Sequence, residues 1–158
     1  MKFNGVAVDA TYVETVVVPR GAAQYVFKAR PLSEADETFF EEVCPRPVPP
    51  EFTMPGGGKE TDTTNAKYVE SRRVWSERRS EFLFMRSLSA TEDLEWDTVI
   101  EDDPTTWGNI ENELLASGFL NPEIILIFNA AIAANGLDTS KIEKATKSFL
   151  ATQAQEQD

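Results

Sequence analysis

The chain has 158 residues, a formal net charge of −12, 41% apolar residues and 27% charged residues, a composition typical of a small globular protein. It contains one cysteine, Cys44, and no histidine, which excludes an internal disulfide, His-based zinc sites and the Ser-His-Asp and Cys-His catalytic arrangements. The negative charge disfavours binding to the phosphates of nucleic acid. No stretch has the length of an apolar signal segment or a membrane span, so we expect a cytoplasmic protein with no membrane partner.

The first part of the chain has the pattern of a small antiparallel sheet covered by a helix. Residues 12–30 predict a β-hairpin, because two runs rich in β-branched and aromatic residues flank a Pro-Arg-Gly turn. Residues 5–8, GVAV, are a candidate third strand. A helix over residues 33–43 follows, in which Ser33 and Asp36 have the spacing of a capping box.

A proline- and glycine-rich stretch at residues 45–62 predicts a linker or a long loop between two parts of the chain. It would separate an N-terminal part, residues 1–44, from a helical domain at residues 63–151, and the polar residues 152–158 predict a disordered tail. The expected fold class is therefore α+β: a hairpin or three-stranded sheet with a helix, followed by a mainly α-helical C-terminal part.

The helical part begins with a long amphipathic helix over residues 65–88. Tyr68, Trp75 and Phe82 recur at seven-residue spacing, and Met85 extends the same apolar stripe by about one turn. The alternating charges of this helix predict ion pairs on a solvent-facing surface, such as Glu70 with Arg73 and Arg73 with Glu77, rather than a nucleic-acid site.

Three further helices are delimited by capping and stop signals. The first of them is predicted to begin at Asp103-Pro104 and to end at Gly118. The second is predicted to begin at Asn121-Pro122 and to end at Asn135-Gly136. Asp138 caps the last helix, which is expected to end near residue 151.

The motifs that resemble catalytic or metal sites are incomplete. GGGK at residues 56–59 lacks the earlier glycine and the following hydroxyl of a phosphate loop. The loop from Asp103 lacks the oxygen ligands of an EF-hand, and the acidic residues 92–103 have the pattern of a solvated connector. We therefore expect no catalytic residue, metal ion or cofactor, and a protein that is not an enzyme.

Residues 121–135 are apolar around almost the whole helix. Positions 124, 127, 128, 131 and 135 share one face, and an overlapping face carries Ile125, Phe128 and Ile132. Such a helix is either central in its own fold or covered by another chain, and both alternatives stay open. The candidate protein-binding residues are Ile124, Ile127, Phe128, Ile132, Tyr68, Trp75 and Phe82.

Four stretches, taken in order, carry a family resemblance over roughly residues 31–151. They read PLSEADETFFEEVCPRPVPP, YVESRRVWSERRSEFLFMRSLS, LEWDTVIEDDPTTWGNIENELLASGF and NPEIILIFNAAIAANGLDTSKIEKATKSFLA. Together they resemble the tail assembly chaperones of long-tailed bacteriophages.

The resemblance implies a protein of the host cytoplasm that binds the tape-measure protein, helps to recruit the tail-tube protein and leaves before the virion is complete. Such chaperones are often made in a short and a frameshifted longer form. The alternatives are a structural tail or head-tail subunit, a phage-encoded inhibitor of a host protein, and an enzyme using carboxylates and a divalent metal. A homo-oligomer is possible.

Overall fold

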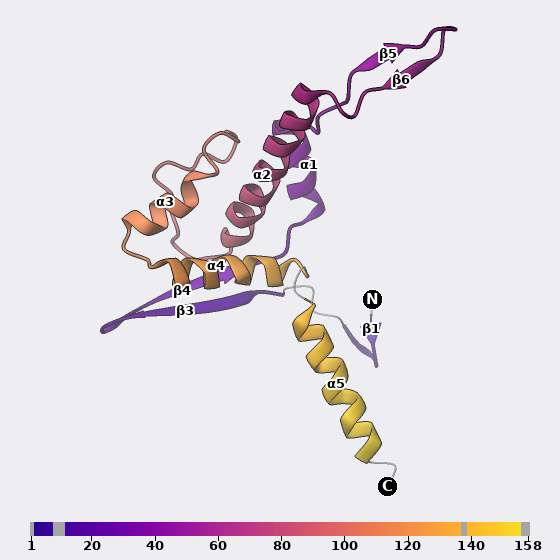
Figure 1. The fold of residues 1–158 in the computed structure, drawn as a ribbon. Coiled ribbons are helices and arrows are strands. Elements are labelled where there is room, and N and C mark those ends of the chain that lie inside the picture. The colour runs from indigo at the N-terminus through magenta and orange to yellow at the C-terminus, as the bar shows by residue number, and fades with distance from the viewer. Residues whose placement is uncertain (1, 8–11, 137–138, 156–158) are drawn as a thin grey trace.

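The computed structural model describes residues 2–7, 12–136 and 139–155, and it has the expected α+β fold (Figure 1). The strands and helices are, in chain order, β1 Lys2–Phe3, β2 Val6–Ala7, β3 Glu14–Arg20, β4 Ala23–Ala29, α1 Glu34–Val43, β5 Glu51–Thr53, β6 Lys59–Thr61, α2 Ala66–Leu88, α3 Asn109–Ala116, α4 Asn121–Ala134 and α5 Ser140–Gln155.

The predicted hairpin is confirmed by β3 and β4, which pair in antiparallel register from Glu14↔Ala29 to Arg20↔Ala23. Gly21, at φ 58°, is the first of the two loop residues, as a type II′ turn requires. The side chains alternate between the two faces of the hairpin. Val18 and Phe27 are buried on the inner face, whereas Val17 is exposed on the outer face.

The expected third strand does not join this hairpin. Val6 and Ala7 form β2, but β2 pairs with β1 in a separate two-stranded sheet. Asn4 and Gly5 both have positive φ, 51° and 82°, so the chain makes the tight Asn-Gly turn that returns it directly onto β1. Residue 8 of the predicted strand lies outside the described residues.

The expected linker contains a second short hairpin. β5 and β6 pair in antiparallel register and project from the N-terminal end of α2 (Figure 1). The Met54 N–H donates to the Gly58 carbonyl at 2.7 Å, and the Asp62 N–H donates to the Pro50 carbonyl at 2.8 Å, so backbone bonds close both ends. All six strand residues are exposed, which means that no core stabilises this arm.

The predicted helix starts at Ser33 and Asn65 are confirmed. The Ser33 hydroxyl accepts from the Asp36 N–H while the Asp36 carboxylate accepts from the Ser33 N–H, which completes the capping box. The Asn65 side chain accepts from the N–H groups of Lys67 and Tyr68.

The residues on both sides of the proline-rich stretch share one core. α4 lies across β3 and β4 and against α2, and α1 packs along α2 (Figure 1). At the centre, the Phe82 ring lies 5.0 Å from that of Phe40 and 5.1 Å from that of Trp107, between ring centroids. The stretch thus separates two parts in sequence that are joined in space.

The helix predicted from Pro104 begins five residues later, since α3 starts at Asn109. The Asp103 carboxylate accepts from the N–H and hydroxyl of Thr105, which forms a turn in place of a helix cap. The Trp107 indole N–H is shared between the carbonyls of Ile100 and Glu101, so the buried ring fixes the chain before the helix.

The predicted end of α3 at Gly118 is confirmed. Gly118 has φ 87°; its N–H donates to the Leu115 carbonyl, and the Phe119 N–H donates to the Leu114 carbonyl. These two bonds form the Schellman motif.

The two C-terminal helices differ from the prediction only near their ends. α4 is capped at Leu120, whose N–H donates to the Glu123 carboxylate, and Gly136, at φ 68°, follows its end. α5 runs to Gln155, so residues 152–155 of the predicted disordered tail are helical. Asp138, the predicted cap, and residues 156–158 lie outside the described part of the chain.

Replacing Trp107 with alanine is expected to lower the free energy of unfolding by about 3–5 kcal/mol, because a fully buried ring leaves a cavity. Urea denaturation followed by circular dichroism measures the change. Val48→Ala, at a side chain 83% exposed, serves as a control and should change it by less than about 0.5 kcal/mol. Equal effects for the two variants would contradict the placement of Trp107 in the core.

Candidate protein-binding surface

α4 buries one face in the core of its own chain. Ile124 is 2% exposed and Ile127 is 0% exposed, and Ala131 and Ala134 continue the same face. This face packs against β3, β4 and α2. Two of the sequence-predicted binding residues, Ile124 and Ile127, are therefore core residues and offer no surface to a partner in this conformation.

The opposite side of α4 is left uncovered. Ile125 is 58% exposed and Leu126 is 55% exposed, and Leu120, just before the helix, is 61% exposed. We call these three side chains the α4 flank. None of the three is in the predicted binding set. The sequence does carry a signal for this side, the polar residue Asn129, which lies one turn after Ile125 and Leu126. In the structure Asn129 is exposed as well.

Two further predicted residues lie between the buried face and the α4 flank. Phe128 and Ile132 are half-buried. The Phe128 ring stacks on Phe84 of α2, with 4.3 Å between ring centroids, so α2 covers part of it. A substitution at either position would disturb the core as well as the surface.

The predicted stripe on α2 divides in the same way. Phe82 is fully buried, whereas Trp75 and Tyr68 are half-buried. The Trp75 indole N–H donates to the Cys44 carbonyl at 3.0 Å, which attaches α2 to the chain after α1. Tyr68 lines a hollow of about 320 Å³ with Pro47, Val48 and Pro50 of the proline-rich stretch, among other residues. The stripe therefore serves mainly internal packing.

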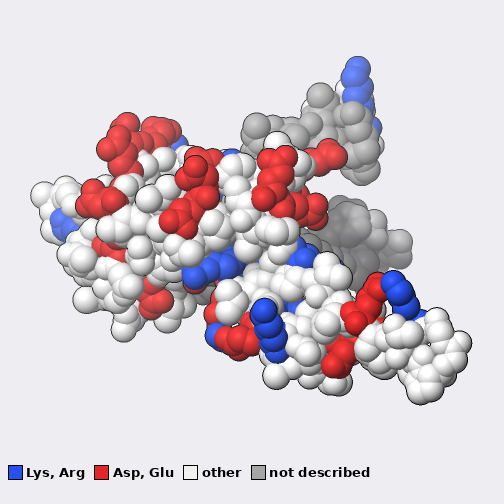
Figure 2. Space-filling model, turned by 90° about the horizontal axis from the view of Figure 1, so that it is seen from above, with Lys and Arg blue, Asp and Glu red and all other residues white. Residues whose placement is uncertain are grey.

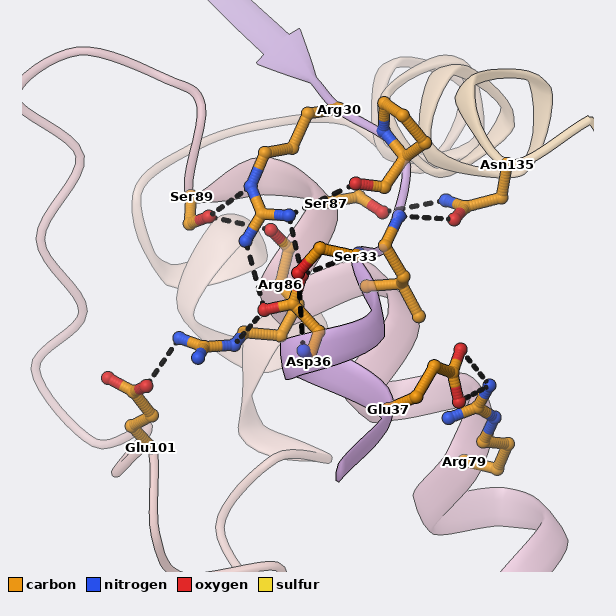
Figure 3. Close-up of polar contacts among 12 residues, drawn as sticks. Arg30, Ser33, Asp36, Glu37, Arg79, Arg86, Ser87, Ser89, Glu101 and Asn135 are labelled. Atoms are coloured by element: carbon orange, nitrogen blue, oxygen red, sulfur yellow. Dashed lines mark hydrogen bonds and ion pairs between the residues drawn. The ribbon is translucent and has the colours of Figure 1, made fainter. Parts of the chain in front are cut away.

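One buried carboxylate joins several elements of the core (Figure 3). Asp36 of α1 is 3% exposed and accepts both terminal nitrogens of Arg30, at 2.6 and 3.1 Å. It also accepts the N–H and hydroxyl of Ser33, and the Arg86 Nε of α2 lies 3.0 Å away as an ion pair. Arg86 extends the network to Glu101. A single buried anion thus links β4, α1, α2 and the acidic connector.

The network shifts the pKa values of Asp36 and Arg30. Hydrogen bonds from Arg30 hold the pKa of the Asp36 carboxyl well below its ordinary value, against the opposing effect of burial, and bonds from Ser33 act in the same direction. The bond to Asp36 likewise raises the pKa of Arg30. An anion that already accepts this many donors is poorly placed to take up a proton near neutral pH, so Asp36 has the properties of a structural group.

Both ends of α4 are held by polar contacts. At its start, Glu123 accepts Arg20 of β3 at 2.7 and 2.5 Å. At its end, the Asn135 side chain accepts the Leu32 N–H at 2.8 Å and donates to the Ser87 hydroxyl at 2.8 Å (Figure 3). The α4 flank is therefore presented on a helix whose position is fixed.

Acidic side chains gather on the surface of the protein without forming a metal site. Figure 2 shows them in several clusters on the face seen from above, separated by uncharged surface. In the connector, Glu92 pairs with Lys28, and Thr105 donates to Asp103. Within the described residues, no group of three or more Asp, Glu or Cys side chains is placed to hold a metal ion. No helix of that part of the chain is both long and apolar enough to span a membrane.

Comparisons with known protein families, with curated proteins and with solved structures found no match for this chain. The resemblance to tail assembly chaperones therefore stays a prediction from the quoted stretches.

Replacing Asp36 with asparagine is expected to lower the free energy of unfolding by about 3 kcal/mol at pH 7, because Arg30 and Arg86 lose a buried counter-ion. The folded pKa of Asp36 is lowered, so its contribution is fully present above its unfolded value of about 3.9 and is lost as the pH falls through the folded value. Urea denaturation at several pH values should therefore show a gap between wild type and variant that narrows in acid. The control Glu70→Gln, which removes one partner of a solvent-exposed ion pair, should leave the free energy of unfolding nearly unchanged. A difference between wild type and Asp36→Asn that has the same size at every pH would contradict the assignment.

Proposed function

We propose that this protein is a non-catalytic tail assembly chaperone, which binds an apolar stripe on the helical tape-measure protein of a long-tailed phage. The observation that carries the proposal is the α4 flank: Leu120, Ile125 and Leu126 are each more than half exposed in a chain with a net charge of −12. Grouped exposed apolar side chains mark protein–protein contact sites. The likeness in sequence supplies the identity of the partner.

A helix presented in this way suits a helical partner. Ile125 and Leu126 lie on the outward side of a regular helix, where the apolar stripe of a client helix can pack against them. Because Arg20 and Asn135 hold the two ends of α4, little conformational freedom is lost on binding. The site is in this sense preformed.

The charge of the chain fits the same role. With 27 acidic and 15 basic residues, the protein would keep a bound apolar client in solution. Several arginines already pair within the chain, such as Arg73 with Glu70 and Glu77 and Arg79 with Glu37. We include in the proposal residence in the host cytoplasm and a part in recruiting the tail-tube protein, as the family likeness implies.

The double variant Ile125→Asp with Leu126→Asp is expected to abolish co-purification with a co-expressed fragment of the tape-measure protein, because two buried charges would oppose an apolar contact. Asn129→Asp, on the same exposed side, is the control and should retain binding. Thermal unfolding of the free protein should be nearly unchanged in both. A folded double variant that still binds the fragment would show that the α4 flank is not the site. Ile132→Asp is less suitable, since Ile132 is half-buried.

A chaperone and a structural subunit differ in whether they remain in the finished phage particle. If the protein leaves before tails are complete, mass spectrometry of purified phage particles should detect the tape-measure and tail-tube proteins without it. Its presence in stoichiometric amounts would instead favour a permanent tail or head-tail subunit. Lysates of the same infected cells are the positive control for its detection.

A further inference from the structure

The backbone of β3 has a free edge whose orientation follows from the hairpin turn. Arg20 and Ala23 flank the two loop residues, so in an antiparallel ladder Arg20, Val18 and Val16 bond to β4. The N–H and C=O groups of Thr15 and Val17 then point away from β4. Pro19 also faces that way, which costs the ladder no bond because proline has no N–H.

The other edge of the hairpin confirms this alternation and is closed at Lys28 and Arg30. The outward N–H and C=O of Lys28 both meet the Thr91 hydroxyl, at 2.8 and 3.0 Å. The Arg30 N–H donates to the Ser87 carbonyl at 3.0 Å. Among the described residues, none bonds to the outward backbone groups of Thr15 or Val17 in a comparable way. Within the described residues, the β4 edge is therefore capped over its last residues, whereas the β3 edge is open at both Thr15 and Val17.

The outer face beside the open edge is apolar. Val13, Val17 and Val26 are 41%, 49% and 42% exposed, and Val17 lies directly opposite Val26. Residues 12–19 contain a single charged residue, Glu14, in a chain with 27% charged residues. A charge-poor stretch of β-branched residues with unpaired backbone groups is a template for another strand.

We propose that β3 pairs with β3 of a second copy of this chain, antiparallel and centred on Thr15, to form a four-stranded sheet. In this register Thr15 faces Thr15 of the second copy, and Val13 faces its Val17, so each outward N–H meets a carbonyl. Centring on Val17 would instead place Pro19 opposite Thr15 and lose bonds, so Pro19 selects the register.

A second copy fits this edge because the stretch is complementary to itself. A two-fold axis at Thr15 brings each valine of one edge against a valine of the other. Glu14 faces Val16 of the second copy rather than its Glu14, so no like charges are directly opposed. The pairing also turns a two-stranded sheet, which is marginal alone, into one of four strands. This inference uses none of the α4 flank and does not depend on the proposed function.

The oligomeric state of Thr15→Pro tests the pairing. Analytical ultracentrifugation of the full chain should give about twice the chain mass of 17.6 kDa at high micromolar concentration. Thr15→Pro removes an outward N–H from each copy and should raise the dissociation constant at least about tenfold. The matched control Gln24→Pro removes an outward N–H from the opposite edge and should leave the dimer intact. A wild-type protein that is monomeric at every concentration, or a Thr15→Pro variant that dimerises equally well, would overturn the proposal.

Disulfide trapping tests the register with no loss of backbone bonds. In a Cys44→Ala background, Thr15→Cys should form a covalent dimer on mild oxidation, because directly opposite Cα atoms lie about 5.5 Å apart. Val13→Cys should not, since its equivalent in the second copy would lie about 13 Å away at about 3.3 Å per residue. Equal trapping at both positions, or none at position 15, would refute this pairing.

Discussion

The fold depends on the packing of α4 against the β3–β4 hairpin. A two-stranded sheet is barely stable alone, and the inner face of this one, with Val18 and Phe27, needs a cover. α4 supplies it with a face that alternates large and small side chains, in which Ala131 and Ala134 allow the helix to approach closely. Because α2 packs against α4 and β4, and α1 packs against α2, the parts before and after the proline-rich stretch form one core.

The polar contacts give this core its fixed geometry. Asp36 forms ion pairs with Arg30 and Arg86 where the end of β4 meets α1 and α2. The relative positions of these three elements therefore depend on one buried anion. Arg20 and Asn135 add a contact at each end of α4. With α4 held by its inner face and both ends, only its outer flank remains open.

Sequence patterns predicted elements that are defined by local bonding. The Ser33–Asp36 capping box, the Gly118 stop and the hairpin all follow from neighbouring residues. The predictions failed where a tight turn or a distant contact decided the structure: at Asn4-Gly5, and where the burial of Trp107 delays α3. The open side of α4 was missed for a related reason, since a helix that is apolar all round has little periodicity to show which face the core takes.

The size of the α4 flank bears on how such a protein would hold a client. Three half-exposed apolar side chains contribute roughly 3 kcal/mol when covered, which is below the estimated 4 kcal/mol or more that association costs. One flank alone would bind weakly and release easily, as a transient role requires. In a dimer paired through its β3 strands, two α4 flanks would be linked to one another. Once one flank has bound a long client with repeated apolar stripes, the second would bind the same client at a high effective concentration. Under the two proposals together, dimerisation would raise the avidity for the client without enlarging either contact, and loss of the dimer would favour its release.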